Sequence, residues 1–376
     1  MTDTVGDHRG LHSQRGALTG EHPGRSANPV IKVADLAWLE FDKPDLRRAE
    51  IFAHAFGFAT ASRTDTELQL RGTDPAAPCV IIRQGPTTRF RGMAFTAADD
   101  GDLPRLATAT GTHVQPLPDS LGGVAVALVD PSGIPVKVVS GTRPLDPVPA
   151  QRPQTYNIGH DLGRVNATQR PLRAPAAVQR LGHVVLQTTK YLAALDWYLD
   201  TLGMIVSDFQ FYPGQRDRGP TMSFIRCDRG SEPADHHTVA LALGPANRYL
   251  HSAYQVCDLD ALAAGGEHLK DNGYQRSWGI GRHIQGSQIF DYWRDPDDFL
   301  VEHFTDGDMF DNTLEPGWAP LTASGLAQWG PPATADFLGT GARHLRGEAT
   351  ALLTALREEN EFDLHRLIGL MKVARS

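Results

Sequence analysis

One pattern of secondary structure recurs four times along the 376 residues of this chain, and it limits the possible folds more than any other feature. Each copy begins with a strand-like run, continues with a helical stretch and ends in further short strands. The opening runs are DLAWLEF at Asp35, GMAFTA at Gly92, HVVLQT at His183 and HSAYQV at His251. A repeated unit of this kind predicts duplicated supersecondary modules of the order βαβββ.

The elements inside each copy have their own sequence signals. The expected helices are PDLRRAEIFAHAFG, DGDLPRLATAT, KYLAALDWYLDTLG and DLDALAAGGEHLKDNG. In the third of them, helical spacing would place one apolar face on Leu192, Leu195, Tyr198 and Leu199. The second and fourth copies end alike, in VDPSGIPVKVVSG at 129–141 and WRDPDDFLVEHFTDG at 293–307. A strand, a DP turn and a second strand predict a hairpin in both.

The four modules divide into two pairs, because a stretch rich in Pro, Gln, Arg and Asn separates the second from the third. We expect a disordered leader at 1–28, a first domain at 29–145, a linker at 146–177, a second domain at 178–310 and a partly helical C-terminal extension at 311–376. Each paired unit is long enough to bury a core of its own. The predicted fold class is α+β, with two domains of paired βαβββ modules and a C-terminal helical tail.

Composition excludes several classes of protein. No run of residues approaches the roughly eighteen consecutive apolar positions that a membrane-spanning helix requires. The formal net charge of −8 offers no basic stripe for phosphates, so we expect no nucleic-acid partner. The cysteines, Cys79, Cys227 and Cys257, match neither a disulfide framework nor a zinc site, which favours a reducing, cytoplasmic location.

Three residues of the second domain form a candidate metal-ligand set. His183 and His251 stand at the start of the opening strands of the third and fourth modules, and Glu302 lies on the last strand of the fourth. Two imidazoles and one carboxylate are the ligands of facial-triad Fe(II) sites, which keep coordination positions open. A single histidine is more often a structural residue than a metal ligand. The predicted metal site therefore depends on the matching positions of the two histidines and on the glutamate.

The first domain lacks these residue types at the corresponding positions. Aligning the two DP turns places Lys137 where Glu302 stands. The opening strands place Gly92 and Leu36, the latter to within one residue, at the two histidine positions. Because Lys, Gly and Leu side chains do not bind iron, we expect the first domain to be a duplicated scaffold without the metal site.

The chain resembles a known family at these residues. Residues 178–306 resemble the catalytic domain of type I extradiol ring-cleavage dioxygenases of the vicinal-oxygen-chelate superfamily, and residues 30–142 resemble that family's non-catalytic domain. The family signature runs from a histidine through a tyrosine and a DP turn to the ligand glutamate, and here it reads GRHIQGSQIFDYWRDPDDFLVE. Two positions depart from it: Asp291 replaces an aliphatic residue, and Asp298 replaces the Gly or Pro that closes the turn. These departures concern the surroundings of the substrate more than metal binding.

The resemblance implies an Fe(II)-dependent dioxygenase that opens a catechol ring beside the diol with O2, with Mn(II) as a possible replacement for iron. The metal would be bound by His183, His251 and Glu302. The implied partners are a catecholic small molecule and O2, with no membrane partner. The chain is also expected to form a homo-oligomer.

Three further residues are implied to take part in catalysis. His237, shortly before the ligand His251, would be the acid–base, and its neighbour His236 would point to the opposite face of a strand and be structural. Tyr292 would hydrogen-bond a substrate oxygen, and His283 would steady that contact. An ordinary hairpin tyrosine and an ordinary loop histidine are the structural alternatives for the last two.

The substrate is expected to be a neutral catechol that carries an alkyl or aryl substituent. Val185 stands where some relatives have a polar residue, and Trp278 stands where relatives that use carboxylated catechols have an arginine. An enzyme of the 4-hydroxyphenylpyruvate dioxygenase type is the nearest alternative, since it shares the ligand set but does not call for His237, His283 and Tyr292. A non-enzymatic protein that binds aromatic compounds on the same scaffold is a second alternative, and it would need no metal ligands.

Overall fold

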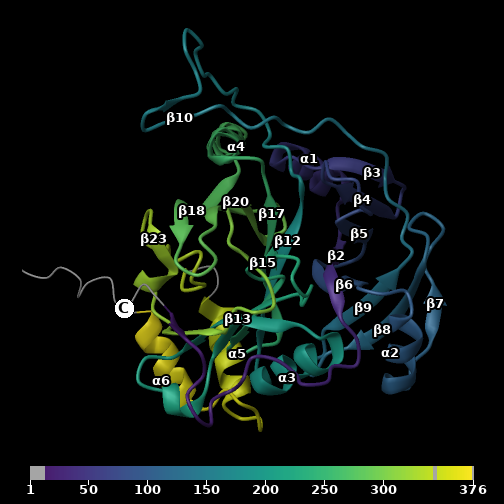
Figure 1. The fold of residues 1–376 in the computed structure, drawn as a ribbon, viewed down its shortest axis with the longest axis vertical. Helices are drawn as coiled ribbons and strands as arrows, with labels where there is room; N and C mark the ends of the chain where they lie inside the picture. Colours follow the sequence, from purple (N-terminus) through teal and green to yellow (C-terminus); the bar gives the residue numbers. More distant parts are fainter. Residues whose placement is uncertain (1–12, 342–344, 375–376) are drawn as a thin grey trace, which may run out of the picture.

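The computed structural model describes residues 13–341 and 345–374, which form two mixed β-sheets with helices packed against them (Figure 1). The first sheet has eight strands in the order β3-β4-β5-β2-β6-β9-β8-β7. The second has eleven in the order β1-β22-β13-β14-β16-β12-β17-β20-β19-β18-β23. The predicted α+β class is confirmed.

The first sheet consists of two consecutive βαβββ modules. Their elements are β2 (Val33–Lys43), α1 (Leu46–Phe56), β3 (Ala59–Arg63), β4 (Glu67–Arg71), β5 (Val80–Gln84), then β6 (Arg89–Ala97), α2 (Asp102–Thr110), β7 (Val114–Pro116), β8 (Val124–Val129) and β9 (Pro135–Ser140). In each module the first and last strands pair in parallel, β2 with β5 and β6 with β9. The opening strands β2 and β6 pair antiparallel and join the modules.

The second sheet repeats the same arrangement. Its modules are β12 (Arg180–Thr188), α3 (Tyr191–Leu202), β13 (Ile205–Phe211), β14 (Met222–Arg226), β16 (Val239–Leu243), then β17 (Arg248–Gln255), α4 (Leu259–Asp271), β18 (Gln275–His283), β19 (Ile289–Arg294) and β20 (Leu300–Thr305). Strand β12 pairs in parallel with β16, β17 in parallel with β20, and β12 antiparallel with β17. Both predicted hairpins are present, as β8–β9 and β19–β20.

Local sequence explains where the helices begin and end. Asp45 caps α1 by accepting a hydrogen bond from the Arg48 N–H, and Gly57 ends the helix at φ 115°, a backbone conformation that favours glycine. In α3, Leu195, Tyr198 and Leu199 are buried as predicted. Leu192 is 38% exposed, because the buried face of the helix lies to the other side, on Tyr191 and Ala194.

Segments outside the modules extend the second sheet at both edges. The C-terminal extension adds β22 (Gly317–Pro320) beside β13 and β23 (Ala327–Trp329) beside β18, followed by α5 (Leu345–Ala355) and α6 (Leu364–Val373). The linker holds the short hairpin β10 (Asn157–Ile158) and β11 (Asp161–Leu162). Strands β15 (Ala234–Asp235) and β21 (Met309–Phe310) form a further small pair.

The expectation of a disordered leader at 1–28 is wrong for its described part. Strand β1 (Gln14–Arg15) pairs with β22, and the Arg25 backbone bridges to Ile205 of β13. Arg216 binds this segment as well, through hydrogen bonds to Glu21 at 2.7 and 3.1 Å. The polar composition of the segment suggested disorder, but its backbone pairs with strands at the edge of the second sheet. Residues 1–12 lie outside the described residues.

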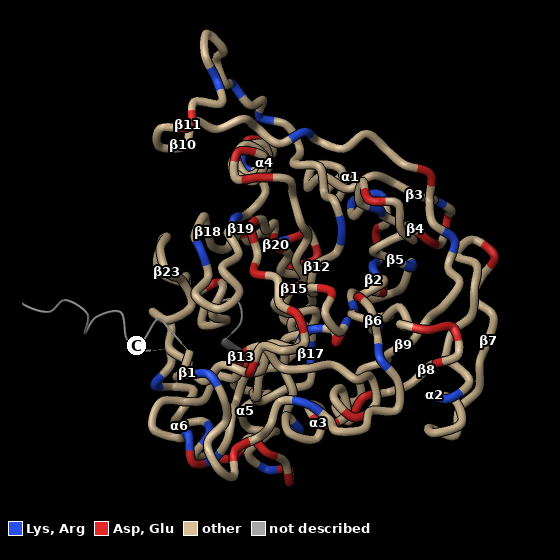
Figure 2. Tube along the Cα trace, in the orientation of Figure 1, with Lys and Arg blue, Asp and Glu red and all other residues tan. Residues whose placement is uncertain are grey.

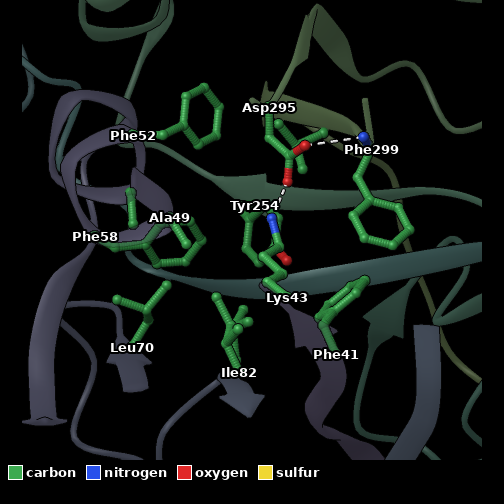
Figure 3. Close-up of a pocket in the computed structure, with 13 residues that line it drawn as sticks. Phe41, Lys43, Ala49, Phe52, Phe58, Leu70, Ile82, Tyr254, Asp295 and Phe299 are labelled. Atoms are coloured by element: carbon green, nitrogen blue, oxygen red, sulfur yellow. Dashed lines mark hydrogen bonds and ion pairs between the residues drawn. The ribbon is translucent and has the colours of Figure 1, made fainter. Parts of the chain in front are cut away.

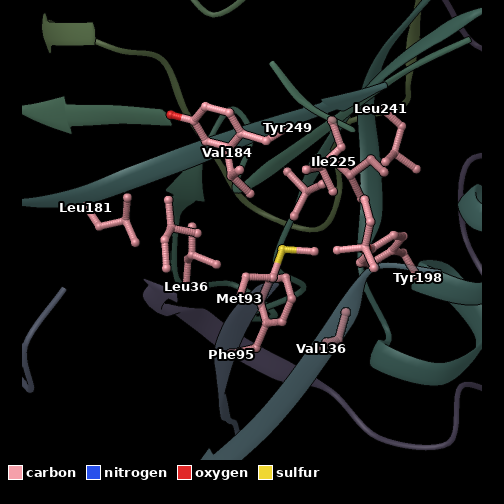
Figure 4. Close-up of a cluster of buried hydrophobic side chains, with 14 of the residues drawn as sticks. Leu36, Met93, Phe95, Val136, Leu181, Val184, Tyr198, Ile225, Leu241 and Tyr249 are labelled. Atoms are coloured by element: carbon pink, nitrogen blue, oxygen red, sulfur yellow. The ribbon is translucent and has the colours of Figure 1, made fainter. Parts of the chain in front are cut away.

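The two sheets share one large apolar core instead of burying two separate ones. Figure 4 shows side chains of the first sheet, among them Met93, Phe95 and Val136, packed against Val184 and Ile225 of the second. Because side chains along a strand alternate between the two faces of the sheet, each sheet has one apolar face in this shared core. The side chains on its opposite face do not contribute to that core.

A second contact between the halves is charged. Lys43 at the end of β2 pairs with Asp295 and Asp297 in the turn before β20, beside a small cavity of about 40 Å³ (Figure 3). Elsewhere, Lys and Arg residues are interspersed with Asp and Glu residues over both halves of the chain (Figure 2). No helix among the described residues is long and apolar enough to cross a bilayer.

Candidate metal centre

The three predicted ligands come together on neighbouring strands of the second sheet. His183 lies on β12, His251 on β17 and Glu302 on β20, and these strands are adjacent in the order β12-β17-β20. Glu302 Oε2 lies 3.4 Å from His183 Nε2 and 3.5 Å from His251 Nε2. One ligand atom from each residue falls within 4.8 Å of the other two.

The polar atoms of this cluster lack the partners that burial normally requires. Glu302 is fully buried, and neither of its oxygens has a hydrogen-bond partner among the described residues; the same holds for His183 Nδ1. A buried carboxylate without hydrogen bonds is strongly destabilising unless a cation neutralises it. A divalent metal among the three side chains would supply that charge, so these residues fit a facial-triad ion.

The electrostatics of the cluster favour metal binding. Burial alone would raise the pKa of Glu302, but the adjacent imidazoles of His183 and His251 hold it well below its usual range. Burial lowers the pKa of His251, and Glu302 only partly opposes that shift. A metal site of this kind needs an ionised carboxylate and neutral imidazoles, and the pKa directions of Glu302 and His251 favour these forms near neutral pH.

Strand register corrects one of the predicted equivalences between the halves. The residues that face one another across the strands are His183–Ala253–Glu302 in the second sheet and Trp38–Ala94–Lys137 in the first. Trp38, and not Leu36, therefore takes the place of His183. The prediction was wrong because strand β2 begins at Val33, and the start of an apolar run in the sequence does not mark the register.

An ion pair takes the place of a metal in the first sheet. Lys137 pairs with Glu40, and the Trp38 Nε1–H donates to Glu40 Oε1 at 3.0 Å. Burial tends to raise the pKa of Glu40, but Lys137 and the hydrogen bonds of Trp38 and Arg83 bring it down to about 2. The lysine ammonium thus neutralises the carboxylate of this half, where none of Trp38, Gly92 and Lys137 could serve as a ligand.

His237 lies directly beside the cluster. Its ring is 4.0 Å from that of His183, centroid to centroid, and burial lowers its pKa well below the usual value. His236 does not point to an opposite strand face, as alternation predicted. Residues 236–238 connect β15 to β16 without strand pairing of their own, and the two Nδ1 atoms of His236 and His237 lie 3.0 Å apart.

Tyr292 and His283 also lie at the cluster and contact one another. Tyr292 packs edge to face on His251 with ring centroids 5.1 Å apart. The His283 Nδ1–H donates to the Leu326 carbonyl at 2.8 Å, and burial lowers the pKa of His283 to about 4, so its Nε2 is an acceptor at neutral pH. The Tyr292 hydroxyl therefore donates to His283 Nε2 at 2.9 Å.

The cluster lies beside a partly open cavity of about 60 Å³. Its lining combines the five histidine and tyrosine side chains with Val185, which was expected near the substrate. It also includes residues that the sequence did not point to, namely Met222, Phe224, Gln285, Gln288, Leu326 and Phe337. Leu326 and Phe337 belong to the C-terminal extension, in a part that was expected to be a tail. No local signal marks them, because they reach the cavity only through the pairing of β23 with β18.

Comparisons with known proteins agree with this fold. Residues 180–303 match the Glyoxalase/Bleomycin resistance protein/Dioxygenase superfamily. Metapyrocatechase 2 of Cupriavidus necator is 28% identical over 88% of this chain and 98% of its own length. Biphenyl-2,3-diol 1,2-dioxygenase 2 of Rhodococcus globerulus is 31% identical over 43% of this chain and 78% of its own length.

A solved structure shows the same fold at low identity. The 2,3-dioxygenase LapB from Pseudomonas sp. KL28 superposes with a TM-score of 0.63 and 17% identity, covering 77% of this chain and 98% of its own. The chain belongs to the glyoxalase/bleomycin resistance protein/dioxygenase superfamily, as one of its extradiol ring-cleavage dioxygenases. It is an oxidoreductase of the catechol 2,3-dioxygenase type.

Proposed function

We propose that the enzyme depends on Fe(II) bound by His183, His251 and Glu302, and that it cleaves a neutral, alkyl-substituted catechol with O2. The observation that supports this most directly is the set of three ligand atoms within 4.8 Å of one another, two of which belong to His183 and His251 in the wall of a cavity. Mn(II) accepts the same ligand types, so metal analysis has to decide between the two ions. We assign the chemistry to residues 178–310 and a scaffold role to residues 29–145.

The metal would supply Lewis acidity toward the two catechol oxygens and the one-electron chemistry that O2 requires. The protein supplies orientation and protons. Tyr292 donates to His283, so its oxygen lone pairs are free to accept a hydrogen bond from a substrate hydroxyl. His237 is uncharged in its buried position and is suited to accept a proton from the substrate and return it to the product.

The lining and size of the cavity support the proposal of a neutral substrate with a short substituent. Among the described residues that line it, none is a lysine or an arginine that would neutralise a substrate carboxylate. On a scale where one water needs about 10–15 Å³, its 60 Å³ corresponds to about four to six waters, so a bound ring would leave little space for a large substituent. Met222, Phe224 and Phe337 are apolar neighbours for an alkyl group, whereas an aryl group would have to displace one of them.

The test combines metal analysis with oxygen uptake on anaerobically purified protein. We expect about one Fe(II) per chain, since the structure offers one such ligand set in residues 178–310. Oxygen uptake with a yellow product is expected to be faster with 3-methylcatechol than with 2,3-dihydroxybiphenyl. Protein that retains no metal after reconstitution would refute the ligand assignment, and faster turnover of the biphenyl diol would refute the substrate preference.

A further inference from the structure

His237 is the last member of a buried chain of three polar side chains. Asp208 on β13 lies 2.7 Å from His236, measured from Oδ2 to Nε2. The Nδ1 atom of His236 in turn lies 3.0 Å from the Nδ1 atom of His237. All three side chains are buried, and the His236 side chain is fully inaccessible to solvent. The chain thus connects a carboxylate outside the cavity with the imidazole that lines it.

The order of donors along this chain follows from the chemistry of the atoms. An ionised carboxylate only accepts, so the His236 Nε2–H donates to Asp208. When a neutral imidazole donates from one nitrogen, its other nitrogen is an acceptor, so in the neutral form of His236 the Nδ1 atom accepts and the His237 Nδ1–H donates to it. The remaining nitrogen, Nε2 of His237, then carries a lone pair and not a hydrogen.

The surrounding residues hold His236 in this orientation. The backbone N–H of His236 donates to the Asp308 carbonyl at 2.9 Å, and the Ser207 hydroxyl donates to the backbone carbonyl of His236 at 2.6 Å. Its ring packs between Phe224 and Phe310, with centroids 5.3 and 5.6 Å away. The ring therefore has little freedom to turn over and exchange its two nitrogens.

Asp208 has a charged neighbour on its other side. Arg15 of β1 lies 3.7 Å from Asp208 Oδ1, at the wall of a separate polar cavity of about 280 Å³. Burial raises the pKa of Asp208, but His236, a hydrogen bond of the Ser13 side chain and the Arg15 charge more than offset this, so the pKa lies below its usual value and the carboxylate is ionised. The leader segment thereby orients the first member of the chain toward His236.

We propose that Asp208 and His236 are positioning residues for His237, and that they fix its Nδ1 as the protonated nitrogen so that Nε2 faces the substrate as an acceptor. This inference rests on the proposed acid–base role of His237. When a catechol hydroxyl gives its proton to Nε2, the oxygen keeps the electron pair and the Nδ1–H bond to His236 is unchanged. The carboxylate of Asp208 then stabilises the added positive charge through His236.

Asp208→Asn tests the proposal because it reverses the order of donors without changing shape. In this variant the Arg15 guanidinium favours the orientation in which the side-chain oxygen of the new asparagine faces Arg15. The NH2 group of the asparagine then faces His236 Nε2. His236 would then donate from Nδ1 to His237, and His237 would present an N–H to the substrate. In a serine protease triad the corresponding exchange lowers kcat about 10⁴-fold with the geometry intact. We expect kcat to fall at least about 100-fold and KM to stay within about threefold.

A double-mutant cycle separates positioning from damage to the fold. Asp208→Asn is combined with His237→Asn, and iron content and anaerobic substrate affinity are measured for every variant. If Asp208 acts only through His237, its substitution has no further effect on kcat in the His237→Asn background. Asp308→Asn is the matched control, since Asp308 lines the same polar cavity but contacts His236 only through its backbone. It is expected to keep kcat within about threefold.

The outcomes are distinct. Non-additive losses with unchanged iron content and substrate affinity support the proposal, whereas additive losses, or a kcat within threefold of wild type for Asp208→Asn, overturn it. If Asp208→Asn does not retain iron, His236→Phe replaces it in the same cycle, because a phenyl ring fills the space between Phe224 and Phe310 without the hydrogen bonds. Full activity of His237→Asn alone would instead refute the acid–base role in the proposed function.

Discussion

Replacing Glu302 by Gln changes the charge of the metal site with almost no change of shape. The carboxylate is fully buried, and its neighbours are the Nε2 atoms of His183 and His251 at 3.4 and 3.5 Å. A neutral amide neither balances a divalent ion nor offers two equivalent oxygens. We therefore expect the variant to fold and to lose the stabilisation that Fe(II) gives to the wild-type protein.

The size of that stabilisation follows from ligand linkage. Iron that binds only the folded state adds about 4.1 kcal/mol when its free concentration is a thousand times the dissociation constant. Unfolding entropy near 2.1 cal/mol/K per residue gives roughly 0.8 kcal/mol/K for the 376 residues, so the wild-type Tm rises by about 5 °C. If Glu302→Gln weakens binding a thousandfold, the gain at the same iron concentration falls to about 0.4 kcal/mol, less than 1 °C.

The assay is anaerobic thermal unfolding of each protein with and without Fe(II). His303→Asn serves as the control because His303 is the next residue on β20 and is equally buried, but its Nε2 bonds the Phe56 carbonyl at 2.7 Å on the opposite face. It should lower the Tm of the metal-free protein and keep the iron-induced rise. An iron-induced rise in Glu302→Gln equal to that of wild type would refute the assignment of Glu302 as a ligand.

Three further predictions concern the cavity and a buried carboxyl group. Phe337→Ala enlarges the cavity, so kcat/KM for 2,3-dihydroxybiphenyl should rise relative to that for 3-methylcatechol; an unchanged ratio in oxygen-uptake kinetics would contradict the role of Phe337. Tyr292→Phe should retain iron and lose one substrate hydrogen bond, which predicts a KM about 2–13 times higher; an unchanged KM would exclude that contact. Burial raises the pKa of Asp291 to about 7 from 3.8, so its carboxyl destabilises the fold increasingly as pH rises from about 4 to 7. Asp291→Asn should therefore gain stability relative to wild type over that range in urea unfolding, and a pH-independent difference would show that the carboxyl does not titrate there.

Much of the fold could be predicted because its signals are local. The opening strands, the helices that follow them and the two DP hairpins appear where their residue patterns indicated. The candidate ligands His183, His251 and Glu302 could be predicted because two imidazoles at matching repeat positions and a carboxylate on the final strand form a chemically specific set. Their convergence then follows from the module topology, in which the first strands of both modules and the last strand of the second are neighbours.

Other features depended on contacts between residues far apart in the sequence. Leu326 and Phe337 line the cavity because β23 pairs with β18, and a polar leader is ordered because β1 pairs with β22. Asp208 reaches His236 only because β13 and the connection before β16 lie side by side in the folded sheet. No residue pattern near these positions encodes such pairings.

The sequence by itself determined the module order and the half of the chain that carries the candidate ligands, because periodicity and side-chain chemistry are properties of short segments. The tertiary structure decided the register that sets Trp38 opposite Ala94, the size of the cavity and the orientation of His237. These are set by bulges, edge pairing and the packing of distant side chains, whose free energies arise only when the whole chain is folded.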